Sequence, residues 1–132
     1  MSNRIYRLVL NIINNHRLKD IDVMDGIEFE KYVGKILKKN DYTNIHFTEK
    51  YDSGVDIIAT KDGIRWGIQV KRCSRLVKAD AIRQVVAGLN YYGCERAMII
   101  ANSVFSRVAV LLAESNDCVF IDRSGLAKMI KS

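Results

Sequence analysis

The spacing of apolar residues changes along the chain, and this change restricts the possible folds more than any other sequence feature. Before residue 40, apolar residues recur every three or four positions, over 5–13 and again over 29–37. This spacing is typical of amphipathic helices. From residue 45 to residue 71 they alternate with polar residues or form short apolar runs, as in strands. The sequence therefore predicts helices packed against a sheet.

Local signals place the ends of several elements. Asp25 is suited to cap the second helix, because Glu28 follows three residues later and completes a capping box. Strands are expected over 45–48, 55–60 and 64–71. Asp62-Gly63, between the last two, is a strong signal for a tight hairpin turn.

The second half of the chain alternates between helix and strand patterns. Helices are expected from about Ile82 to Gly93, from Ser103 or Ser106 onward, and over 126–131, with strands over 97–101 and 118–121. Strands joined through a helix pair in parallel, whereas strands joined by a tight turn pair antiparallel. We therefore predict an α/β fold in the order αα-βββ-αβ-αβ-α, with a mixed β-sheet of about five strands flanked by helices.

Length and composition add four expectations. At 132 residues, the chain has the length of a single domain, expected to extend over 1–132. The three cysteines are odd in number and widely spaced, which argues against a secreted disulfide framework. Neither histidine lies near a cysteine at a zinc-ligand spacing. Polar residues interrupt the first apolar stripe, which argues against a signal peptide or a membrane span. We therefore expect a cytoplasmic protein without a membrane partner.

The formal net charge of +6 favours a polyanionic partner without requiring one. The cations are densest in one stretch of the second half, at Lys71, Arg72, Arg75, Lys78 and Arg83. Two interpretations of this basic segment, residues 71–83, are open. It is either a solvated face of the protein or a surface that binds nucleic-acid phosphates.

The hairpin predicts a group of polar side chains. A two-residue turn at Asp62-Gly63 places Asp56 directly opposite Gln69, and Lys71 points to the same face as Gln69. A carboxylate, an amide oxygen and an ammonium group then converge. Such a trio suits phosphodiester hydrolysis, with oxygen ligands for Mg²⁺ and a cation beside the reacting phosphate. The alternative is that Asp56 and Lys71 form an ion pair across a strand edge.

These residues stand in stretches that resemble a known family. The stretches 26–30, 53–57 and 69–72 are similar to the catalytic domain of Mrr-like restriction endonucleases, in the PD-(D/E)xK nuclease superfamily. The resemblance continues through 101–106 and 121–122. It therefore covers an Mrr-like core over 24–130, preceded by an N-terminal helix over 1–20. It implies a restriction endonuclease-like fold and a nuclease that uses Mg²⁺, with Mn²⁺ able to substitute.

The resemblance also implies roles for individual residues. The catalytic positions of the trio are Asp56, Gln69 and Lys71, of which the first two bind the metal. The family uses a further glutamate from the early helix. Helical geometry alone does not choose between Glu28 and Glu30, which flank the apolar stripe on opposite sides. Glu30 matches the family's glutamate and becomes the expected auxiliary ligand for metal or water. The alternative for Glu30 is an exposed partner of Lys31 or Lys35.

If the chain is a nuclease, the basic segment becomes a predicted path for DNA phosphates leading to the site. The residues expected to contact nucleic acid are Arg72, Arg75, Lys78, Arg83 and Gln84. Gln84 lies on the helix face opposite the apolar stripe, beside small residues. The alternative for Gln84 is a merely solvated side chain.

Three functions follow from these observations. The first is a metal-dependent endodeoxyribonuclease that cuts duplex or branched DNA. The second is a Holliday junction resolvase acting as a homodimer, because archaeal and phage resolvases are similar in length and share the superfamily fold. The leading helix over 5–13 would then form the dimer interface, or it covers the sheet. The third is a non-catalytic nucleic-acid-binding module. A small metabolic enzyme is disfavoured, because no phosphate-binding glycine loop or nucleophile motif is present.

Overall fold

The computed structural model describes residues 3–49 and 54–132, and their side chains except those of 10–16. These residues form five helices and five strands. The elements are α1 (Asn3–Asp22), α2 (Gly26–Lys39), β1 (Thr43–Phe47), β2 (Ile57–Lys61), β3 (Ile64–Lys71), α3 (Ala79–Tyr92), β4 (Arg96–Ala101), α4 (Arg107–Ser115), β5 (Val119–Ile121) and α5 (Arg123–Lys131). Residue 53, the first residue of the family-like stretch 53–57, lies outside the described residues. The predicted order of elements is confirmed.

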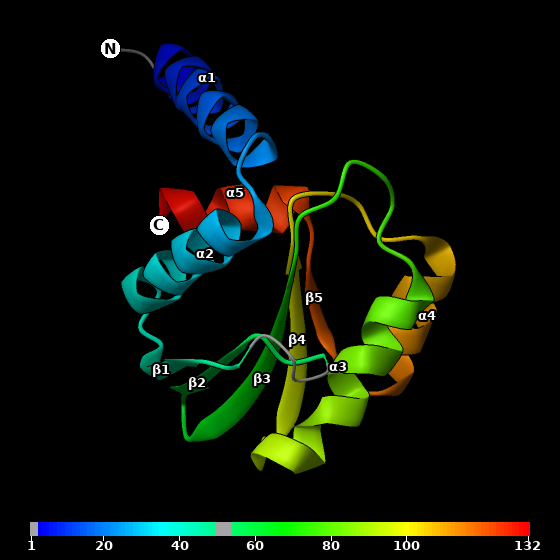
Figure 1. Ribbon diagram of the computed structural model, residues 1–132. Coiled ribbons are helices and arrows are strands. Elements are labelled where there is room, and N and C mark those ends of the chain that lie inside the picture. Colours follow the sequence, from blue (N-terminus) through cyan, green and yellow to red (C-terminus); the bar gives the residue numbers. More distant parts are fainter. Residues whose placement is uncertain (1–2, 50–53) are drawn as a thin grey trace.

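The strands form one mixed sheet in the order β1-β2-β3-β4-β5 (Figure 1). β1, β2 and β3 pair antiparallel, and β3, β4 and β5 pair parallel. The parallel strands are joined through α3 and α4, whereas β2 and β3 are joined by a tight turn. The predicted α/β fold with a mixed sheet of five strands is therefore confirmed.

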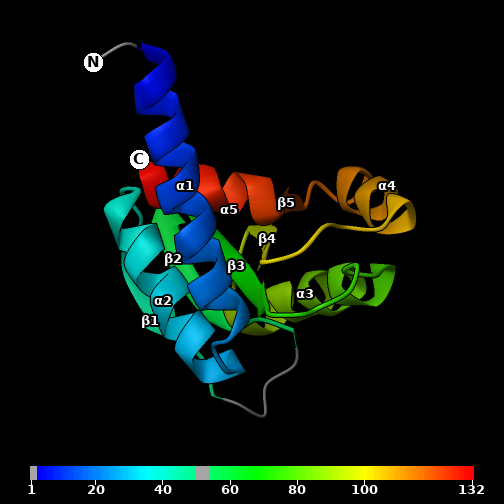
Figure 2. The ribbon, with the colours of Figure 1, turned by 90° about the horizontal axis from the view of Figure 1, so that it is seen from above.

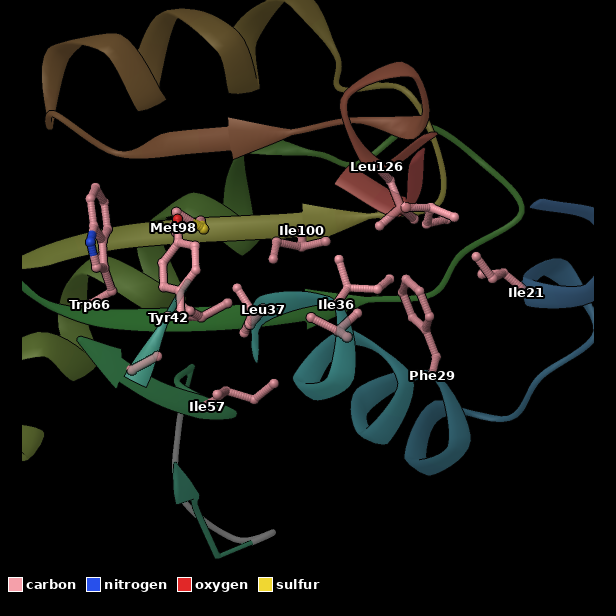
Figure 3. Close-up of a cluster of buried hydrophobic side chains, with 14 of the residues drawn as sticks. Ile21, Phe29, Ile36, Leu37, Tyr42, Ile57, Trp66, Met98, Ile100 and Leu126 are labelled. Carbon is pink, nitrogen blue, oxygen red and sulfur yellow. The ribbon is translucent and has the colours of Figure 1, made fainter. Parts of the chain in front are cut away.

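Helices cover both faces of the sheet (Figure 2). α1, α2 and α5 lie on one face, and α3 and α4 lie on the other. Each face has its own apolar core. On the α2 face, Phe29, Ile57 and Leu126 are fully buried (Figure 3). On the α3 face, Val55, Ile82 and Ile99 are fully buried. The two cores fix the helices against the strands that carry the candidate site.

The β2–β3 turn has the geometry that its sequence predicts. Asp62 and Gly63 have φ angles of 53° and 77°, as two-residue hairpins with a type I′ turn require. The strands pair from Lys61 with Ile64 to Ile57 with Ile68, in the predicted register. The turn therefore determines which residues of the two strands face each other.

Helix ends agree with the local signals. The capping box of α2 is present, with the Glu28 N–H donating to the Asp25 carboxylate at 2.8 Å. α3 ends at Gly93, which has a left-handed φ of 63°, and Ser106 caps α4. α5 begins earlier than expected because Asp122 caps it, accepting from the Gly125 N–H at 2.9 Å.

α1 ends two residues later than the N-terminal helix predicted over 1–20, and it extends away from the rest of the molecule (Figure 1). Ile5, Tyr6, Leu8 and Val9 are exposed near its start. Its last turn is anchored, because Leu18 and Ile21 are buried in the core of the α2 face. Within the described ranges, no helix combines the length and the apolar character needed to cross a membrane.

Candidate active site

The predicted site residues come from elements that meet at one end of the sheet. β3 carries Gln69 and ends at Lys71, and the antiparallel β2 begins beside that end. Asp56 directly precedes β2. Glu30 lies near the start of α2, which packs against β3. The fold therefore brings these four residues to the same end of the sheet.

Asp56 occupies the point where the β2–β3 ladder stops. The paired positions end with Ile57 opposite Ile68, one residue short of the predicted pairing of Asp56 with Gln69. The Asp56 carboxylate oxygen Oδ2 instead accepts a hydrogen bond from the Val70 N–H at 2.7 Å. The Asp56 N–H donates to the Ile68 carbonyl at 2.8 Å. The side chain thus takes the place of a backbone acceptor, which turn length alone could not predict.

The charge on Asp56 responds to two opposing effects. Burial raises the pKa of its carboxyl above the ordinary value, while the Val70 N–H and the Lys71 ammonium lower it. Lys71 is therefore close enough to influence Asp56 electrostatically. A bound cation would favour the ionised carboxylate that burial disfavours.

Gln69 points toward α3, on the face opposite α2. Its side chain is 7% exposed, and its amide Nε2 donates a hydrogen bond to Oε1 of Gln84 at 3.2 Å. Its own Oε1 is buried, and no described residue donates to it. A buried acceptor without a donor costs about 1–3 kcal/mol. A cation coordinated by this oxygen would remove that cost.

Glu30 and Asp56 line the same cavity of about 510 Å³, between the start of α2 and the start of β2. The other lining residues are Asp25, Gly26, Ile27, Thr48, Glu49 and Val70. Glu28 is instead held at the helix start, where its carboxylate accepts from the Asp25 N–H at 3.4 Å. The structure thus separates two glutamates between which helical geometry could not choose.

Sequence reasoning did not identify Thr48, which positions the backbone of Asp56. The Thr48 N–H donates to the Asp56 carbonyl at 3.0 Å, and its hydroxyl donates to the Val55 carbonyl at 2.6 Å. Thr48 follows β1, and no motif marks it in the sequence. Its role depends on the pairing of β1 with β2.

The donor set of this region fits a hard cation. Two carboxylates and the unpartnered amide oxygen of Gln69 are all oxygen donors, which Mg²⁺ prefers. No three His, Cys, Asp or Glu side chains are arranged to hold a metal in the part of the chain that the structure describes. Glu30 and Asp56 therefore supply carboxylates to the cavity, whereas Gln69, which points toward α3, is not among its lining residues.

The basic segment runs from the end of β3 into α3. Arg72, Arg75, Lys78 and Arg83 are all exposed. Arg72 also donates to the Asp22 carbonyl at 3.3 Å. Gln84 is exposed as well, but its hydrogen bond joins it to Gln69. These four cations are therefore exposed in the part of the chain that follows Lys71.

A polar cluster that includes the Cys73 N–H of the basic segment was not predicted. Arg123 forms a two-pronged ion pair with Asp22, with N–O distances of 2.7 and 3.0 Å. The buried Asn102 donates to the same carboxylate at 3.0 Å and accepts from the Cys73 N–H at 2.8 Å. The cluster joins α1, the residues after β3 and β4, and α5.

Comparison with known proteins places the chain in a family. The Mrr_cat family model, described as restriction endonuclease, matches residues 21–130. The chain belongs to this restriction endonuclease family. The Mrr_cat match includes all four candidate catalytic residues and the basic segment, and it leaves out most of α1. No match was found among curated proteins.

Three solved structures share the fold of this Mrr_cat chain. A protein of unknown function, AF1548, has a TM-score of 0.68 at 16% identity, over 77% of this chain and 63% of its own. The DNA modification-dependent restriction endonuclease AspBHI has a TM-score of 0.68 at 12% identity, over 89% of this chain and 35% of AspBHI. The restriction endonuclease MspJI, in complex with a 27-mer oligonucleotide, has a TM-score of 0.59 at 16% identity, over 99% of this chain and 32% of MspJI. The chain thus spans less than two thirds of each.

Proposed function

We propose that this chain is a metal-dependent endonuclease that hydrolyses phosphodiester bonds in DNA. The main support is the gathering of Asp56, Gln69 and Lys71 at one end of β3, in a chain of the Mrr_cat family. Mg²⁺ is the proposed cofactor, and Mn²⁺ is able to replace it. The nuclease domain would extend over residues 1–132.

The proposed roles follow from the chemistry of each side chain. Asp56 and Glu30, which line the cavity, would supply carboxylate ligands to the cation. The Gln69 Oε1, to which no described residue donates a hydrogen bond, would supply an amide oxygen. When bound, the cation would polarise the phosphate and lower the pKa of a bound water. The Lys71 ammonium would attract the attacking water or the charge that develops on the phosphate.

DNA is the proposed substrate. The exposed cations of the basic segment continue from Lys71 into α3, which suits successive phosphates of a nucleic-acid backbone. MspJI, which shares the fold, was solved with an oligonucleotide. The chain spans about a third of MspJI and AspBHI. Recognition of a base sequence or a modified base is therefore not part of this proposal.

A substrate panel tests the proposal. Purified protein is incubated with plasmid, linear duplex and branched DNA, in Mg²⁺ or in EDTA, beside Lys71→Ala and Asp56→Ala. We expect cleavage by the wild type in Mg²⁺, none in EDTA, and a loss of at least about 100-fold in either variant. Equal inactivity of all three proteins on every substrate, or equal activity in EDTA, would contradict it.

The same panel separates a junction resolvase from a general endonuclease. A homodimer that resolves Holliday junctions makes symmetric paired nicks in a four-way junction and leaves unbranched duplex intact. Equal cutting of unbranched duplex supports the general endonuclease. Binding that falls steeply with salt but gives no product in Mg²⁺ or Mn²⁺ indicates a non-catalytic DNA-binding module.

A further inference from the structure

The side-chain amide of Gln69 is held in one orientation by α3. An amide presents an oxygen on one side and an NH₂ group on the other, and the two differ in what they bind. The Gln69 Nε2 donates to Gln84 Oε1 at 3.2 Å, so the nitrogen faces α3. The oxygen of the same amide is buried and has no hydrogen-bond donor among the described residues.

The position of Gln84 is itself fixed relative to Asp56. Gly54 has a φ of 81°, and a Cβ at this residue would lie 2.0 Å from the Gln84 carbonyl oxygen. The loop that leads into Asp56 therefore packs directly on the α3 backbone at Gln84. Val55 and Val85, the next residues of these two segments, are both fully buried. Gln84 on α3 and Asp56 before β2 therefore belong to two segments that pack directly against each other.

We propose that Gln84 is a positioning residue for the cation site. By accepting the hydrogen bond of the Gln69 NH₂ group, Gln84 directs the Gln69 oxygen to the cation and keeps the NH₂ group away from it. This inference rests on the proposed function, in which the Gln69 oxygen is a metal ligand. It gives Gln84 a role different from direct contact with DNA.

The role of Gln84 as an acceptor determines which substitutions matter. Gln84→Met keeps the length of the side chain and removes the acceptor, so the Gln69 amide is no longer held. Ordering one such side chain costs about 0.5–1.5 kcal/mol, which corresponds to about a two- to tenfold change in affinity. Gln84→Glu keeps an acceptor in the same place. Its added charge is controlled by Ala87→Glu, because Ala87 is exposed one turn further along the same helix face.

The test measures Mn²⁺ binding to the DNA-free protein by electron paramagnetic resonance. We expect Gln84→Met to bind Mn²⁺ about two- to tenfold more weakly than the wild type, with an unchanged melting temperature. Gln84→Glu should bind it as Ala87→Glu does. In a Gln69→Ala background, where Asp56 and Glu30 remain, Gln84→Met should cause no further loss. That result would separate positioning of Gln69 from any direct role of Gln84.

Three outcomes would overturn the inference. One is unchanged Mn²⁺ affinity in Gln84→Met, with or without a loss of DNA affinity. The second is an equal loss of Mn²⁺ affinity in Gln84→Glu, compared with Ala87→Glu, and in Gln84→Met, compared with the wild type. The third is that Gln84→Met lowers Mn²⁺ affinity in the Gln69→Ala background as much as it does in the wild type. Failure of the wild type to bind Mn²⁺, or equal binding by Asp56→Asn, would instead overturn the proposed metal site and the inference with it.

Discussion

Gly54 is the residue at which the loop before β2 meets α3. Its φ of 81° lies in the left-handed region, and the Gln84 carbonyl occupies the space that a side chain would need. Both conditions favour glycine, but they act differently. A left-handed backbone strains any residue with a Cβ, whereas a backbone contact of 2.0 Å forces the two segments apart.

Substitution of three glycines by alanine separates these two effects. We expect Gly54→Ala to lower the free energy of unfolding by more than about 2 kcal/mol, because strain and collision add. Gly63→Ala should cost about 1 kcal/mol, because Gly63 has a φ of 77° but open space around its Cα. Gly26→Ala, with neither constraint, should be neutral within about 0.5 kcal/mol. Chemical denaturation measures all three, and equal effects at Gly54 and Gly63 would show that the contact with α3 has no cost.

At the scale of elements, the end of α1 is joined to α5 through Asp22 and Arg123. The two prongs of this ion pair, 2.7 and 3.0 Å long, connect residues that are 101 positions apart. Arg123 also donates to the Asn102 carbonyl at 3.0 Å. The hydrogen bond from Arg123 is the main reason that the pKa of the Asp22 carboxyl lies below its ordinary value of 3.8. Both side chains remain more than a third exposed, which limits the stabilisation to about 1 kcal/mol or less.

The lowered pKa of Asp22 predicts how this stabilisation depends on pH. The folded state binds the proton more weakly than the unfolded state, so the contribution is complete above about pH 4 and is lost as the pH falls through the folded pKa. At pH 7, Asp22→Asn should therefore be less stable than the wild type by about 0.5–1 kcal/mol. The difference should shrink toward zero under strongly acidic conditions. Denaturation from pH 7 to pH 2 measures it, with Glu114→Gln, exposed on α4, as the control. A difference that grows on acidification would contradict the assignment.

The elements themselves were predictable because their signals are local. Alternation over 64–71 gave β3 with its observed bounds, and Asp62-Gly63 gave the turn and the register. The Asp22–Arg123 pair could not be predicted, because it depends on how α1 and α5 dock. The stop of the ladder at Asp56 was missed for a related reason. The Asp56 carboxylate, rather than a backbone carbonyl, accepts the hydrogen bond of the Val70 N–H. The pattern of apolar residues does not indicate such a side-chain hydrogen bond.

At the scale of the whole molecule, exposed cations contribute to the net charge of +6 on both faces of the sheet. The basic segment extends from the end of β3 into α3, whereas α5 lies on the opposite face (Figure 2). A chain that binds DNA only through its overall charge would lose affinity equally when any exposed cation is removed. If binding depends on the basic segment, removal of one of its cations would weaken DNA binding more than removal of a cation from the α5 face.

Salt dependence tests which description holds. Each phosphate contact contributes about 0.9 to the slope of log affinity against log salt concentration. We expect Arg75→Ala, Lys78→Ala and Arg83→Ala each to lower the magnitude of that slope by about 1 and to weaken binding of all DNA sequences alike. Lys128→Ala, exposed on α5, removes the same charge from the opposite face and should leave the slope unchanged. Fluorescence anisotropy with a labelled duplex, in EDTA to prevent cleavage, measures the slopes. An equal decrease in all four variants would show that binding follows net charge, and the basic segment would then be a solvated face.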